Sequence, residues 1–276
     1  MAESPLPSFA SPPVTEVVIA VAFRPIEGLT GPRIGQLWSE QFEDRFRRVE
    51  EHLPYEPPIE RLDQSIPTSV IDLHIGADFP RPRVWLLNDS GDEVIQIQRD
   101  YFACNWRKVE PNAEYGRWGL RRSSFQAAYS KFESFISGHE LGKIQPTQCE
   151  VTYVNHIVTG EGWSTHGDVG SIFRLVGDAA YEEEHFEGRL EQMAFGVQYR
   201  LEKAGVPFGR LHVGATPGVR TLDNAVLYQL QLTARGRPFP QEDGILAFAD
   251  EGRKAIVSAF AAITTPGMHR IWRRNE

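Results

Sequence analysis

The chain has 276 residues, of which 41% are hydrophobic and 24% charged, and this globular composition excludes an intrinsically disordered protein. Its formal net charge of −8 disfavours a nucleic-acid partner, because nonspecific nucleic-acid binding usually needs a basic surface. No stretch reaches the roughly 20 apolar residues of a membrane span, so we expect no membrane partner.

The first predicted elements are a strand and a helix. Residues 1–13 lack the basic and apolar regions of a secretion signal, so we expect a disordered lead-in and a cytoplasmic protein. Apolar residues at every second position predict a strand over 14–23. Pro32 then opens a helix whose apolar residues recur at helical spacing as far as Val49. The proline-rich stretch 53–60 is predicted to be a loop.

Three short strands are predicted next, at about residues 69–75, 84–87 and 93–106. Turn-forming residues at 88–91 predict a hairpin between the last two. Within the third, Ile97 and Phe102 have opposite parity. We therefore expect them to face opposite ways, across a bulge or break near residues 99 and 100.

The rest of the chain repeats this order with a less regular middle. A helix is predicted over 115–137, and a short terminal helix is predicted to be capped by Thr265. The other predicted elements are strands at 148–158, 190–202, 208–213 and 225–234, an irregular stretch at 159–188 and a helix at 242–263.

The expected fold is α+β, an antiparallel sheet with long helices packed on one face, in two pseudo-equivalent βαβββα-like halves. The halves are residues 14–145 and 146–276, and one continuous domain is expected. The arrangement resembles TATA-box-protein-like or helix-grip folds in topology alone, and such a likeness does not fix function.

One face of the predicted sheet is rich in amide, imidazole and guanidinium groups. These groups suit hydrogen bonding to a partner or ligand, whereas an ordinary solvent-facing sheet surface is the alternative. If the sheet curls around a helix, the same face lines a polar cavity. The candidate binding residues on it are Gln96, Gln98, Glu150, Thr152, His156, Gln198, Arg200, Arg210, His212, Gln229 and Gln231.

Motifs for catalysis, cofactors and metals are missing from the sequence. No glycine-rich phosphate loop, zinc-protease motif or nucleophile elbow occurs, so no catalytic residue, cofactor or metal is expected. The strongest metal candidate is the acidic run 182–185 with His166 and Asp168, for which a solvated loop is the favoured interpretation. Cys104 and Cys149 are predicted to be reduced structural thiols.

Several segments together carry a resemblance: PPVTEVVIAVAF, VIQIQRDYF, NWRKVE, CEVTYVNHI and FAAITTPGMHRIW. They resemble a sporadically distributed bacterial family of proteins of about this length, whose motifs have no assigned chemistry. Such a distribution is typical of genes in defence or toxin–antitoxin neighbourhoods. The resemblance covers nearly the whole chain and implies a bacterial origin and this context.

Three functions are compatible with these features. The first is a non-enzymatic adaptor or inhibitor that recognises a protein partner or a second copy of itself, in a defence or toxin–antitoxin type module. The alternative is a helix-grip-like pocket that binds a small ligand or catalyses a reaction, with Glu150, His156 and His212 as acid–base groups. Nucleic-acid binding through Arg200 and Arg210 ranks last.

Overall fold

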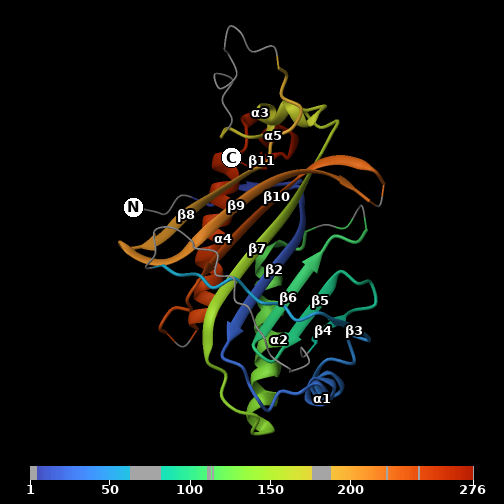
Figure 1. The fold of residues 1–276 in the computed structure, drawn as a ribbon, viewed down its shortest axis with the longest axis vertical. Coiled ribbons are helices and arrows are strands. Elements are labelled where there is room, and N and C mark those ends of the chain that lie inside the picture. The colour runs from blue at the N-terminus through green and yellow to red at the C-terminus, as the bar shows by residue number, and fades with distance from the viewer. Residues whose placement is uncertain are drawn as a thin grey trace.

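Strands with one apolar and one polar side dominate the fold, as the period-two patterns predict. The computed structural model describes residues 5–62, 82–110, 113, 115–175, 188–221, 223–241 and 243–275. In this part of the chain, nine strands form an antiparallel sheet in the order β3-β4-β5-β6-β2-β7-β10-β9-β8 (Figure 1). Their bounds are β2 Val14–Phe23, β3 Arg48–His52, β4 Arg83–Leu87, β5 Glu93–Gln98, β6 Tyr101–Arg107, β7 Pro146–Val158, β8 Phe195–Lys203, β9 Val206–Arg220 and β10 Ala225–Gly236. The α+β class with a large antiparallel sheet is confirmed.

The centre of the sheet is the antiparallel pair β2–β7, in which Ile19 lies opposite Val151. The strands β6, β5, β4 and β3 follow outward on the β2 side, and β10, β9 and β8 follow on the β7 side. Each side of the sheet is therefore built by one half of the chain.

The apolar side of the sheet packs against two long helices, α2 (Arg117–Gly138) and α4 (Gly244–Ile263). Phe102 on β6 contacts the rings of Phe125 and Phe132 on α2. Under α4, Gly252 lets the helix approach the sheet so closely that an added Cβ would lie 3.1 Å from the Cβ of Ala234. The close packing of these apolar side chains supplies the main stabilisation of the fold.

The two ends of the described chain meet beside α4. Strand β1 (Ser8–Phe9) pairs with β11 (Arg274–Asn275), and Phe9 is buried. The pairing differs from the disorder that composition predicts for residues 1–13. The terminal helix α5 (Pro266–Ile271) is confirmed with its cap, since the Thr265 hydroxyl accepts a hydrogen bond from the backbone N–H of Met268.

The first helix is shorter than predicted. α1 (Gly31–Gln41) ends before Phe42, and Val49 belongs instead to the edge strand β3. The prediction failed because Phe42 and Phe46 keep helical spacing: the Phe46 N–H donates to the Phe42 carbonyl in a turn that does not continue as a helix. The other regular elements are the short η1 (His166–Asp168) and α3 (Val169–Ile172).

The predicted long strand at 93–106 is two strands. β5 and β6 are joined by a turn at residues 99 and 100, and Ile97 lies directly opposite Phe102. Since paired residues share a face, both side chains point into the core, and the prediction that they face opposite ways is wrong. The predicted break near residues 99 and 100 is confirmed, and it is a reversal of the chain rather than a bulge.

Two predicted features lie outside the described residues: the strand at 69–75 and the acidic run 182–185. The hairpin between β4 and β5 is confirmed, with Val84 opposite Ile97 and Leu87 opposite Val94. None of the helices in the described part of the chain is long and apolar enough to cross a membrane.

Candidate functional site

All eleven predicted binding residues lie on one face of the sheet, which we call the polar face. Directly paired residues of neighbouring strands point to the same side. The register runs Arg200–Arg210–Arg235–Glu150 across four strands, and Gln198–His212–Thr233–Thr152 in the next row. On the other half of the sheet, Gln96 pairs with Ala103, and Ala103 with Ala20 beside Glu150. Strand parity thus located the face correctly.

Part of this face is covered, which strand parity alone did not indicate. Gln96, Gln98 and Thr152 are buried, whereas Gln198, Gln229 and Gln231 are exposed. Residues 53–62 follow the edge strand β3 and cross the front of the sheet towards β9 (Figure 1). We call this segment the strap. An outward-pointing residue on this face is therefore not always a solvent-exposed one.

Two glutamines hold the strap by its backbone. The Tyr55 N–H donates to Oε1 of Gln98 at 2.8 Å, and Nε2 of Gln98 donates to the Tyr55 carbonyl at 3.0 Å. Gln148 repeats the pattern, accepting from the Glu60 N–H at 2.8 Å and donating to the Pro58 carbonyl at 2.9 Å. Each amide side chain thus satisfies one backbone donor and one backbone acceptor, as a neighbouring strand would.

The far end of the strap is fixed by charge. Both carboxylate oxygens of Glu60 are engaged, one by the guanidinium of Arg210 and the other by Nε2 of His212 at 2.7 Å. The Glu60 side chain is only 7% exposed. Burial alone would raise its pKa, but the hydrogen bonds from His212 and Arg210 outweigh burial and lower the pKa below its ordinary value.

Small residues give the strap room to lie on the sheet. Ala20 and Ala103 form a small apolar cluster with Tyr101, against which Tyr55 of the strap packs. The rings of Tyr55 and Tyr101 meet edge to face with centroids 5.1 Å apart. Alanines on the polar parity of central strands were a usable signal, because a solvated sheet face would favour longer polar side chains.

Beyond the strap, the polar face is hollowed into an open groove over β8, β9 and β10. Its volume is about 650 Å³, and Gly196 and Gly214, which are paired in the sheet, form part of its floor. Sequence reasoning missed both glycines. The polar side chains around the groove are Gln198, His212, Thr216, Gln229, Gln231 and Thr233.

The remaining predicted residues are distributed around the groove and the strap. Glu150 accepts a hydrogen bond from Nε of Arg235 at 2.7 Å, in a pair whose side chains are 13% and 11% exposed. Burial and then the charge of Arg220 lower the pKa of His156. The Arg200 guanidinium lies 3.4 Å from Glu202 on the exposed end of β8.

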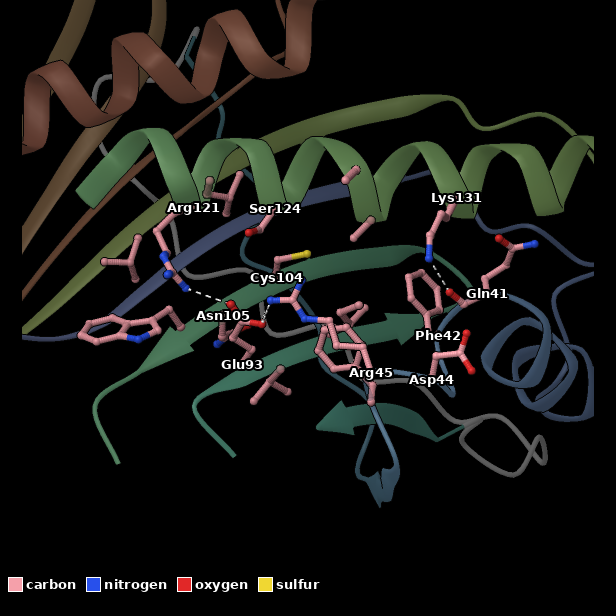
Figure 2. Close-up of a pocket in the computed structure, with 18 residues that line it drawn as sticks. Gln41, Phe42, Asp44, Arg45, Glu93, Cys104, Asn105, Arg121, Ser124 and Lys131 are labelled. Atoms are coloured by element: carbon pink, nitrogen blue, oxygen red, sulfur yellow. Dashed lines mark hydrogen bonds and ion pairs between the residues drawn. The ribbon is translucent and has the colours of Figure 1, made fainter. Parts of the chain in front are cut away.

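On the opposite face, a cavity of about 140 Å³ lies between α2 and the sheet (Figure 2). Figure 2 shows Arg45 and Arg121 approaching the carboxylate of Glu93 from two sides, and Arg121 lies 3.3 Å from it. Glu93 therefore offsets part of the positive charge of these two arginines. Cys104 lines the cavity, and burial raises the pKa of its thiol well above the ordinary value, which leaves a neutral thiol and not a nucleophilic thiolate.

The metal candidate of the sequence is only partly described. Asp168 accepts hydrogen bonds from the backbone N–H groups of Ser164 and Thr165 and thereby caps η1. His166 contacts the Leu227 carbonyl at 3.0 Å. Within the described ranges, no three His, Cys, Asp or Glu side chains are placed to hold a metal ion. Cys104 and Cys149 are free thiols.

Comparison of the chain with protein-family models and with curated proteins gives no match.

Proposed function

We propose that this protein is a non-enzymatic binding protein whose polar face holds an extended segment of a protein partner. The observation that supports this function is the way the strap is bound. Gln98 and Gln148 form hydrogen bonds with the backbone of an extended, proline-containing segment. Arg210 and His212 bind the carboxylate of Glu60 in the same segment. A surface that binds its own chain in this way has the chemistry to bind another chain.

The strap occupies one binding position on the polar face, and we propose that the groove over β8–β10 is a second position, which takes the partner's segment. Three exposed glutamines, Gln198, Gln229 and Gln231, carry the same amide chemistry as the two that hold the strap. The missing side chains at Gly196 and Gly214 allow a backbone to approach the sheet closely. The surface therefore suits a peptide backbone better than it suits the phosphates of a nucleic acid.

The two sides of the sheet are, in this proposal, pseudo-equivalent halves of one domain. β2 then corresponds to β7, the strands β4–β6 to β8–β10, and α2 to α4, which agrees with the strand order on each side of the centre. Under this correspondence, the groove over β8–β10 is the counterpart of the surface over β4–β6, where the strap begins to cross the sheet. Long α2 and α4 would then pack equivalently on the apolar side.

The cellular context is proposed from the family resemblance alone. We infer a bacterial, cytoplasmic protein that acts as an adaptor or inhibitor in a defence or toxin–antitoxin type module. Its partner would be another protein or a second copy of the chain. The molar mass in solution, measured by light scattering across a concentration series, separates these two partners.

A peptide selection tests the function directly. Immobilised protein is used to enrich a random peptide library, and the affinity of an enriched peptide is then measured for two variants. Gly196→Val projects a side chain into the groove, and the position is free, since an added Cβ meets no atom within 4 Å. We expect it to weaken binding about tenfold or more, whereas the wild-type fold is kept because valine suits a strand.

Gly218→Val is the matched control. Gly218 lies on the neighbouring strand β9, opposite Leu227 of β10 and outside the groove, and an added Cβ there also meets no atom within 4 Å. We expect this variant to bind the peptide like the wild type. If no peptide is enriched, or if both variants bind as tightly as the wild type, the groove is an ordinary solvated surface and the proposal is wrong.

The alternative of a small-ligand or enzymatic pocket receives no support from its predicted residues. Glu150 is engaged by Arg235 and His212 by Glu60. Glu150 and His156 line neither the groove over β8–β10 nor the cavities that the described residues form beside the helices.

A further inference from the structure

A second cavity on the helix side has a different character from the one in Figure 2. It lies between α4, the beginning of α2 and the N-terminal segment around β1, and its volume is about 110 Å³. Phe9, Ile256 and Phe260 contribute to its apolar wall. The polar side chains that line it are Ser8, Tyr115, Arg117, Trp118, Tyr153, Asn155 and Arg253.

The charged side chains that line this cavity, among the described residues, are all positive. Arg117 and Arg253 line it, and no Asp or Glu is among its described lining residues. Arg117 is exposed at the surface and donates to the Phe9 carbonyl at 3.2 Å. In the cavity of Figure 2, by contrast, Glu93 lies between two arginines. The cavity near β1 is therefore electropositive inside an apolar wall.

Arg253 also has an unused hydrogen-bond donor. Its Nε is buried and has no hydrogen-bond partner among the described residues. A buried donor without an acceptor costs about 1–3 kcal/mol, and more when the group is charged. A cost of this kind at the wall of a cavity is expected when an acceptor from outside the chain completes the site.

A pair of tyrosines adds a second donor. The hydroxyls of Tyr115 and Tyr153 are 2.9 Å apart, so one proton lies between them and the other is available to a ligand. Burial raises the pKa of both tyrosines above the ordinary value, so both are neutral donors rather than phenolates. The positive charge of Arg253 opposes this rise at both residues.

We propose that this cavity binds a short aliphatic monocarboxylate. The carboxylate would accept from Nε of Arg253 and from the tyrosine pair, and the alkyl body would lie against Phe260 and Ile256. A cavity of about 150 Å³ accommodates benzene, which has six carbons, so the smaller volume here limits the alkyl chain to about three or four carbons. The mostly apolar lining suits a carboxylate that carries an alkyl chain better than it suits a phosphate, which has no apolar body.

Pentanoate and its neutral isostere pentanamide are the probes, and titration calorimetry with ligand-observed NMR is the measurement. We expect saturable binding of pentanoate to the full chain and at least about tenfold weaker binding of pentanamide. Arg253→Met should lose about tenfold or more in pentanoate affinity, and Tyr115→Phe should lose less. Arg200→Met, which removes an exposed guanidinium on the polar face, should bind like the wild type.

The melting temperature of the ligand-free variants separates binding from structure. Arg253→Met removes the unpartnered Nε donor, which is stabilising, and also the hydrogen bond between Arg253 and Tyr153, which is destabilising, so its melting temperature should stay close to that of the wild type. The inference is overturned if pentanoate and pentanamide bind equally, if Arg253→Met keeps the wild-type affinity, or if the wild type shows no saturable binding up to about 10 mM. Peptide binding by the polar face is independent of each of these outcomes.

Discussion

Replacing Gln148 by Ala should release the strap from the sheet without unfolding the protein. The Gln148 side chain makes two hydrogen bonds to the strap, from the Glu60 N–H at 2.8 Å and to the Pro58 carbonyl at 2.9 Å. It lies on the polar face of β7, so truncation leaves the core between the sheet and the helices intact.

The magnitude follows from the two lost hydrogen bonds. Each contributes about 1 kcal/mol net, so the free energy of local strap opening should fall by about 2 kcal/mol. That difference corresponds to an increase of about 30-fold in the population of the open state. The global free energy of unfolding should fall by no more than the same amount.

Amide hydrogen exchange measures this opening residue by residue. The Glu60 amide donates to Gln148, and we expect its exchange in Gln148→Ala to accelerate about 30-fold. Core amides of β7, such as that of Val151, should change less. Gln231→Ala is the control, because this exposed glutamine lines the groove rather than the strap. Unchanged exchange at Glu60, or equal acceleration throughout the sheet, would refute the account of how the strap is held.

Three further predictions concern stability. Deleting residues 264–276 should lower the melting temperature, because it removes Trp272, which is 2% exposed, and burial of one such side chain contributes about 1.5–3 kcal/mol. Phe132→Ala should cost about 3–5 kcal/mol in denaturant unfolding, since this α2 ring is fully buried against the sheet. Burial and the charge of Arg274 lower the pKa of His269, so its contribution to stability is complete above pH 6.5 and is lost as the pH falls below that value. A His269→Gln variant should show a shallower loss of melting temperature between pH 7 and pH 5, and an identical slope would contradict the assignment.

Local sequence patterns were sufficient to locate an element and assign its faces wherever one side of that element is buried. The alternation in β7 and β10 located both strands and assigned their polar side chains to one face, and the pairing of Gln229 with His156 agrees with it. The edge strand β3 was missed because its sequence, RVEEH, has no buried side and hence no apolar alternation. Strand parity determines the side of the sheet to which a side chain points, but it contains no information about which segment covers that side.

The strap could not be predicted for a related reason. Prolines identify residues 53–60 as non-helical and non-strand, but they do not say where an irregular segment lies. Its position depends on contacts distant in sequence, such as the bond between Tyr55 and Gln98, 43 residues apart. The cavity near β1 depends likewise on bringing Phe9, Tyr115 and Arg253 together from three parts of the chain.

The covalent attachment of the strap has a consequence for selectivity. A segment tethered beside its own binding position has an effective concentration in the millimolar range, so a free competitor with the same contacts and micromolar abundance would occupy that position only rarely. The strap therefore competes with any free peptide for the surface over β5, β6 and β7. A free peptide must bind there more tightly than the tethered strap in order to displace it. Under the proposed function, chance sequences with a suitable backbone would be rejected at this position, and the partner's segment would bind over the outer strands β8, β9 and β10.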